Sequence, residues 1–181
     1  MHAIRSLIIF AFTLVLAACS SGPNTRSDLR PGANLASFST YGYFSPLSTD
    51  AAGYSTITTA HIKNAVDREM QRHGFRYSET NPDLLVNFMV TTRQTIQSSP
   101  SSASISYGGW GRRGTHMGMS ASTPNVRTVD EGTLTIDLVE RDSNLLVWRG
   151  AAYGRIPSNA SSNPGGVIDS TVSSIFAQLP R

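Results

Sequence analysis

The fold of this chain is decided by a stretch that reads TLTIDLVERDSNLLVWRGAAY over residues 133–153. Its first part alternates, so that Leu134, Ile136 and Leu138 share one face of an extended strand. Turn-forming residues follow and end in Asn144, which tolerates the positive φ of a tight turn. Because a second apolar strand comes directly after the turn, the stretch predicts a β-hairpin.

Three more segments have the composition of strands in the same sheet. Residues 38–44 alternate and are rich in aromatic side chains, and residues 84–95 place alternate apolar side chains on one face. Residues 75–78 are a shorter candidate. We also expect Trp148, in the second strand of the hairpin, to lie in the core.

Two segments have the period of amphipathic helices. The first covers residues 56–73, where Ser55 or Thr56 can cap the start and Gly74 suits the left-handed position after the end. The second covers residues 164–179 and opens with a capping Asn followed by Pro. The pattern predicts an α+β fold, a single domain with a mostly antiparallel sheet and two amphipathic helices packed on one face.

The first residues have the features of an export signal. Arg5 gives a positive start, and an apolar run over residues 7–16 follows that is too short to span a bilayer. The run ends in Leu-Ala-Ala-Cys19, which resembles the bacterial lipobox, where the thiol accepts a diacylglycerol before cleavage. The pattern predicts a signal peptide at residues 1–18 and lipidation of Cys19. The alternatives are an ordinary signal peptide with an incidental cysteine and a buried apolar element.

Lipidation of Cys19 would fix the mature chain to a membrane. Cys19 is the only cysteine, so no disulfide is possible and the core must be held by packing alone. Residues 19–27 are small and polar, and we expect them to form a lipidated tether before one domain over residues 28–181. By resemblance to sorted bacterial lipoproteins, Ser20 is compatible with the outer membrane. We therefore expect the domain to face the periplasm.

The charge of the chain argues against a nucleic-acid partner. Removal of the signal with Arg5 leaves 14 basic and 12 acidic residues, a net charge of +2. Domains that bind nucleic acid carry a dense basic stripe, which this sequence lacks. The expected membrane attachment is the lipid, since no second segment approaches transmembrane length.

Four segments, taken in order, resemble one family of bacterial lipoproteins. They read AVDREM at 65–70, NPDLLV at 81–86, EGTLTIDL at 131–138 and NLLVWRG at 144–150. In this combination the chain resembles the domain of unknown function 4136 (DUF4136) family, over roughly residues 28–180. The resemblance implies a fold and a location in the cell envelope, and it brings no established activity and no catalytic residues.

One long segment differs from the rest in composition. Residues 97–126 contain eight Ser, five Gly and two Pro, which predicts a Ser/Gly-rich loop. Residues 84–129 include four arginines and no acid. Aromatic and arginine side chains on a flexible segment favour a contact site for an anionic or sugar-rich envelope partner, and a solvated low-complexity excursion is the alternative. The candidate partner-binding residues are Tyr107, Trp110, Arg112 and Arg113.

Motifs for catalysis and cofactor binding are incomplete. Residues 109–114 match GxGxxG, but no strand precedes them and no helical period follows, which argues against a dinucleotide. His61 and His73 are twelve residues apart, and no His or Cys stands at ligand spacing, so we expect neither a metal nor another cofactor. No GxSxG elbow occurs. Five acidic residues on or beside the hairpin could form catalytic pairs, but acids at such positions are ordinarily solvated surface or turn residues. They are Asp130, Glu131, Asp137, Glu140 and Asp142.

The sequence therefore favours a non-enzymatic envelope lipoprotein that binds or supports another envelope component, either a protein or a glycan. A lipoprotein that binds a small ligand in a cleft between sheet and loop is the alternative, and a hydrolase is a third class. A deep apolar pocket would favour the ligand binder, and an exposed contact surface would favour the scaffold.

Overall fold

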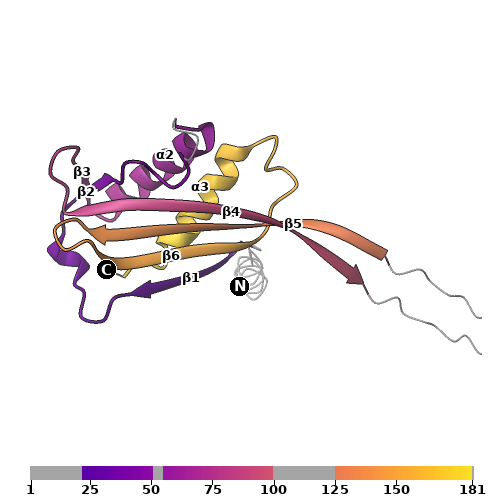
Figure 1. Cartoon of the computed structure of the whole chain (residues 1–181), viewed down its shortest axis with the longest axis horizontal. Helices are drawn as coiled ribbons and strands as arrows, with labels where there is room; N and C mark the ends of the chain where they lie inside the picture. The colour runs from indigo at the N-terminus through magenta and orange to yellow at the C-terminus, as the bar shows by residue number, and fades with distance from the viewer. Residues whose placement is uncertain (1–21, 51–54, 100–124, 181) are drawn as a thin grey trace, which may run out of the picture.

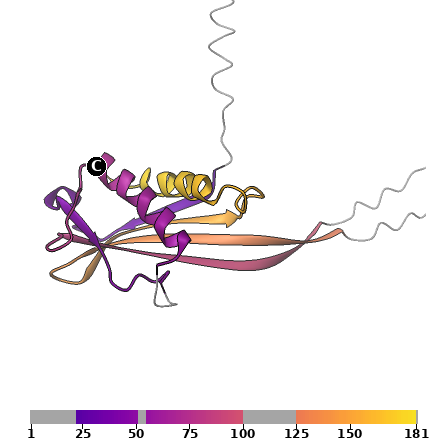
Figure 2. The ribbon, with the colours of Figure 1, turned by 90° about the horizontal axis from the view of Figure 1, so that it is seen from above.

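A computed structural model of the chain describes residues 22–50, 55–99 and 125–180. In this part six strands form one mixed sheet, and two α-helices lie on one of its faces (Figure 1, Figure 2). The predicted α+β fold is confirmed. The strands are β1 (Asn24–Leu29), β2 (Thr40–Tyr43), β3 (Arg76–Tyr77), β4 (Leu84–Ser99), β5 (Asn125–Glu140) and β6 (Leu145–Arg155), and the helices are α2 (Ile57–Arg72) and α3 (Pro164–Phe176).

The sheet combines an antiparallel part with a small parallel part. Its strand order is β1-β6-β5-β4-β2-β3, and β1, β6, β5 and β4 pair antiparallel. β2 runs parallel to both β4 and β3. Because parallel neighbours need a crossover rather than a tight turn, the chain passes from β2 to β3 through α2.

The core lies between the helices and the sheet. Trp148 is only 1% exposed, and its ring lies 5.7 Å from that of Phe176 on α3. A side chain at Gly150 would collide with Trp148 and with Ile175, so the glycine makes room for the indole. The predicted inward faces of β4 and β5 are confirmed by the buried residues Leu84, Val86, Phe88, Leu134, Ile136 and Leu138.

The predicted hairpin is confirmed as β5 and β6. Asn144 has a φ of 54°, the left-handed conformation that its turn requires. Leu138 lies opposite Trp148, and the register shifts directly after this pair, at a β-bulge.

The ends of α2 follow the predicted capping chemistry. Thr56, rather than Ser55, is the N-cap, and its side-chain oxygen accepts a hydrogen bond from the Thr59 N–H at 3.0 Å. At the other end Gly74 has a φ of 90°, and the Phe75 N–H donates to the carbonyl of Met70 at 2.9 Å. This is a Schellman motif, and buried Phe75 supplies its apolar contact.

α3 begins as the sequence predicts and ends three residues early. The side chain of Asn163 accepts a hydrogen bond from the Gly166 N–H at 3.1 Å, with Pro164 at the first helical position. The helix ends at Phe176, and the following turn still buries Leu179 in the core. The predicted apolar face therefore extends past the helix itself.

The prediction that residues 19–27 form a tether is wrong for residues 24–27. These residues belong to β1, the edge strand that pairs with β6 from Asn24 opposite Tyr153 onward. Most side chains of β1 are exposed, so the strand is held mainly by backbone hydrogen bonds. An edge strand of this kind lacks the apolar alternation from which a strand is recognised.

The predicted loop at residues 97–126 is also shorter than expected. β4 continues through Ser99 and β5 begins at Asn125, and the two strands pair up to these residues. The sequence at both ends is polar and rich in Ser, so it lacks the apolar alternation from which a strand is recognised. Residues 100–124 lie outside the described part of the chain.

The Asn-Pro-Asp motif at residues 81–83 has a structural role. One side-chain oxygen of Asp83 accepts hydrogen bonds from the backbone N–H groups of Ser39, at 2.8 Å, and Thr40, at 2.9 Å. These bonds hold the pKa of Asp83 below its usual range. The loop also crosses Gly42 so closely that an added Cβ would lie 2.9 Å from Pro82. The motif therefore fixes the start of β2 beside β4.

Candidate functional site

A two-stranded arm extends from the sheet and is formed by residues 94–99 of β4 and residues 125–130 of β5. β6 ends opposite Glu131, and β2 pairs with β4 only as far as Val86. Within the described residues the arm therefore pairs with no third strand. In Figure 1 it runs well past α2, α3 and β6.

Most described side chains on the arm are exposed, with Val129, at 8%, as the buried exception. Ile96 is 71% exposed, and Gln94, Arg127 and Thr128 are exposed as well. Two strands alone are at best marginally stable in water, and an exposed isoleucine contributes little to folding. The arm is therefore better suited to contact with another molecule than to stabilising its own domain.

Polar contacts tie the root of the arm to the sheet. Glu131 Oε2 accepts hydrogen bonds from Arg93 Nε at 3.3 Å and from the Thr95 hydroxyl at 3.1 Å. On the same strand, the carbonyl of Asp130 accepts from the Ile156 N–H at 2.9 Å. Because Arg93 is mostly exposed, this ion pair is worth at most about 1 kcal/mol, and its effect is to orient the arm.

The site residues predicted from the sequence lie outside the described part of the chain. This applies to the lipidation site and to the partner-binding residues, and the structure places their flanks. Residues 100–124 connect the two strands of the arm at its outer end, and the first described residue, Gly22, lies close to the start of β1. The undescribed candidates are Cys19, Tyr107, Trp110, Arg112 and Arg113.

A cluster that the sequence did not indicate joins β2 to α2. The hydroxyls of Tyr41 and Tyr43 donate to the same Asp67 oxygen, at 2.8 and 2.6 Å. Lys63 Nζ lies 4.5 Å from the centre of the Tyr43 ring, a cation–π contact. Strand alternation places the two tyrosines on one face, but nothing in the sequence pairs them with a helix position.

The protonation of this cluster indicates a structural role. Burial raises the pKa of both Tyr41 and Tyr43 above the usual range, and the hydrogen bond to Asp67 raises it further. The two hydroxyls therefore remain protonated donors at physiological pH. They hold α2 against the sheet and do not supply a general base.

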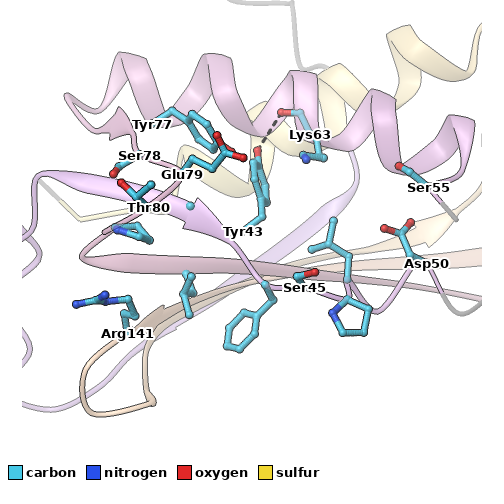
Figure 3. A pocket seen from close by; sticks show the side chains of 16 residues that line it. Tyr43, Ser45, Asp50, Ser55, Lys63, Tyr77, Ser78, Glu79, Thr80 and Arg141 are labelled. Carbon is cyan, nitrogen blue, oxygen red and sulfur yellow. Dashed lines mark hydrogen bonds between the residues drawn. The ribbon is translucent and has the colours of Figure 1, made fainter. Parts of the chain in front are cut away.

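A cavity of about 490 Å³ opens beside the cluster (Figure 3). Lys63 from α2, Glu79 from the loop after β3 and Arg141 from the β5–β6 turn bring charges of both signs to its lining. Arg141 already forms an ion pair with Asp142 at 2.7 Å. The cavity can hold a small polar molecule, but its described lining offers no nucleophile paired with a base.

A larger groove of about 770 Å³ lies between α3, the beginning of α2 and the sheet. Among its described lining residues Arg155 alone is charged, and Gly22 and Pro23 form part of its wall. The groove is therefore nearly uncharged, with hydroxyl side chains among mostly apolar surface, as a small-ligand site would need. Its larger apolar lining residues are Ile62, Val90, Leu134, Ile156, Val167 and Ile168.

The acid pairs weighed in the sequence are occupied by arginines. Asp137 accepts a two-pronged contact from Arg149, at 2.6 and 2.7 Å, which raises the pKa of the arginine. Three further ion pairs take up three of the other four acids, Glu131, Glu140 and Asp142, and no group of three potential metal ligands occurs among the described residues. These pairs are Arg93–Glu131, Arg30–Glu140 and Arg141–Asp142.

No helix in the described ranges combines the length and the apolarity needed to cross a bilayer.

Known structures resemble this chain at low sequence identity. A PDZ domain protein from Parabacteroides distasonis matches with a TM-score of 0.52 and 12% identity over 87% of this chain, which spans only 35% of that protein. A minor lipoprotein from Acinetobacter baumannii matches with a TM-score of 0.45 and 12% identity, over 79% of this chain and 93% of that one. A PelC dodecamer from Paraburkholderia phytofirmans matches with a TM-score of 0.42 and 13% identity, over 86% and 95%.

Sequence comparison gives the clearer assignment. No curated protein sequence matches this chain. A family model described as "Domain of unknown function (DUF4136)" matches residues 25–181, which include the whole domain expected from the sequence at residues 28–181. The chain belongs to the DUF4136 family.

Proposed function

We propose that this chain is a non-enzymatic lipoprotein of the bacterial cell envelope that binds another envelope component through its arm. The observation that supports this function is the arm itself, which leaves the helix-covered sheet and carries the predicted contact residues 107–113 between its strands. Exposed projections held by a rigid sheet are a common way to present a binding surface.

The charge of this region favours an anionic partner. Arg127 and Asp130 both lie on the arm and Arg93 at its root is paired with Glu131, so the excess of positive charge comes from Arg112 and Arg113 in the segment that joins the strands. No acid occurs over residues 84–129. Opposite charge speeds encounter and disfavours wrong partners, so an acidic protein surface or an anionic glycan fits this arm.

The location follows from the proposed lipid on Cys19. β1 begins at Asn24, so only four residues separate Cys19 from the sheet and the domain stays close to the membrane surface. With Ser20 after the cysteine, we place the lipid in the outer membrane and the domain in the periplasm. Replacement of Cys19 by Ser should release the mature protein from the membrane fraction and abolish acyl labelling.

Site-specific crosslinking in the envelope tests the binding function. A photoreactive residue at Ile96 on the arm should capture a discrete partner, whereas the same residue at Ile57 should not. Ile57 is a matched control, because it is 79% exposed but lies on α2, away from the arm. Equal capture at both positions would contradict the proposal.

The predicted contact residues give a second test of the same function. Replacement of Trp110, Arg112 and Arg113 together by Ala should abolish the crosslink from Ile96 without changing the unfolding midpoint. An undiminished crosslink would remove these residues from the binding site.

A further inference from the structure

We infer that the groove beneath α3 holds an acyl chain of the lipid on Cys19. This inference rests on the proposed lipidation, and it adds a binding site within the domain for the lipid itself. It names the occupant of the groove of about 770 Å³ described above.

The lining of the groove matches a hydrocarbon chain. Aliphatic side chains from both helices and from the sheet line the groove together with several Thr and Ser side chains, and the described lining has a single charged residue, Arg155. An anionic ligand such as a phosphate would meet only one charged side chain there, whereas an acyl chain needs none and can cover the apolar surface that makes up most of the groove. At about 770 Å³ the groove falls within the range of small-molecule sites.

Small residues leave the room that this occupant needs. Gly132 and Ala152 lie on the floor of the groove, and Ala160 lies in the loop that leads to α3. Ile156 crosses Gly132 so closely that an added Cβ would lie 3.2 Å from its side chain. Gly132 therefore makes room for Ile156 in the groove wall, and the short side chains of Ala152 and Ala160 fill little of the groove.

The position of the N-terminus selects this acyl chain over one from another source. Gly22 and Pro23 are part of the groove wall, and Gly22 follows Cys19 by three residues. Three residues reach at most about 10–11 Å, so the lipid is attached beside the groove. An intramolecular ligand at this distance binds at a high effective concentration, which a free fatty acid does not reach.

The test compares the lipidated protein with the Cys19→Ser form in the binding of cis-parinarate, a fluorescent fatty acid. Both proteins are kept in amphipol, and their masses show whether Cys19 carries lipid. The Cys19→Ser form should bind cis-parinarate, and the lipidated protein should bind at least tenfold more weakly because its groove is filled. In the Cys19→Ser background, Val167→Trp should weaken binding at least tenfold by filling the groove, and Ile57→Trp should leave it unchanged.

The possible results distinguish a failure of the acyl-chain inference from a failure of the proposed lipid anchor. If neither form binds, or if Val167→Trp binds normally, the groove is no acyl site and the inference falls, while the proposed function stands. If a protein shown by mass to be lipidated binds as well as Cys19→Ser, the groove takes free lipid rather than the anchor, and the inference also falls. If the wild-type mass shows no lipid, the proposed anchor fails and the inference falls with it. A circular dichroism spectrum checks that Val167→Trp is folded.

Discussion

The same two strands, β4 and β5, pass through two very different environments. Near the helices, alternate side chains such as Ile136 are fully buried, whereas Ile96 on the arm is 71% exposed. The backbone pairing is continuous through both regions. Backbone hydrogen bonds therefore define the length of these strands, and the helices decide which part of them becomes a core.

The inner half of this strand pair stabilises the domain, whereas the arm is available for contact with another molecule. Apolar burial stabilises the inner half, since each buried aliphatic side chain contributes roughly 1.5–3 kcal/mol. The arm gains little from burial, yet it orders residues on both strands. Ordering such a segment costs conformational entropy, and its own domain offsets little of this cost. We therefore expect favourable contacts with another molecule to offset the rest.

The largest effect is expected at Ile136. Ile136→Ala removes a fully buried side chain and leaves a cavity between β5 and the helices, so it should lower the free energy of unfolding by about 2–5 kcal/mol. Urea unfolding followed by circular dichroism measures the loss. A loss below about 1 kcal/mol would show that the inner half is not the tightly packed region described above.

A smaller loss is expected at Gly42, where the loop before β4 crosses β2. Gly42→Ala places a Cβ 2.9 Å from both Pro82 Cγ and the Ser78 carbonyl oxygen, so the loop must shift. Forced overpacking of this kind costs about 1–3 kcal/mol. Urea unfolding measures this loss of free energy. An unchanged midpoint would mean that the loop can move away from the added Cβ without cost.

The tyrosines that join β2 to α2 predict a pH dependence. Their pKa is raised in the folded protein, so above about pH 10 the unfolded chain loses phenol protons that the folded protein keeps. Below about pH 10 both phenols are protonated in the folded and the unfolded chain, so they cause no change of the free energy of unfolding with pH. This free energy falls above pH 10 by up to about 1.4 kcal/mol per pH unit for each phenol.

Replacement of both tyrosines isolates this contribution. Tyr41→Phe/Tyr43→Phe should be less stable than the wild type near pH 8, because Asp67 loses two donors, and its stability should decline less steeply above pH 10. Urea titrations between pH 8 and pH 11 measure both slopes. Equal slopes would show that these hydroxyls ionise normally in the folded state.

The sequence was informative wherever one face of an element is covered. The β5–β6 hairpin, the inward face of β4 and both ends of α2 were predicted correctly, because burial and capping leave a local residue pattern. β1 and most of the arm were missed, because their strands are held by backbone pairing and most of their described side chains face solvent. Local sequence carries no comparable signal for such strands.

The candidate sites show the same limit in three dimensions. The bonds from Tyr41 and Tyr43 to Asp67 join residues more than twenty positions apart, and no spacing rule connects a strand to a helix. The groove beneath α3 likewise draws its lining from β1, β4, β5, β6 and both helices. Composition did single out residues 97–126, since a long acid-free segment is visible without knowing its partners.

The smallest effect on stability is expected on the arm itself. Ile96→Ala removes an exposed side chain from the same strand pair as Ile136, so the free energy of unfolding should change by less than about 0.5 kcal/mol. Hydrogen exchange should show faster exchange for the paired amides of residues 94–99 than for those of residues 84–90, because two unsupported strands open easily. A loss above 1 kcal/mol, or equal protection of both segments, would mean that the arm is already packed against a surface in the isolated protein. The sharp division of β4 and β5 into a core half and a contact half would then be wrong.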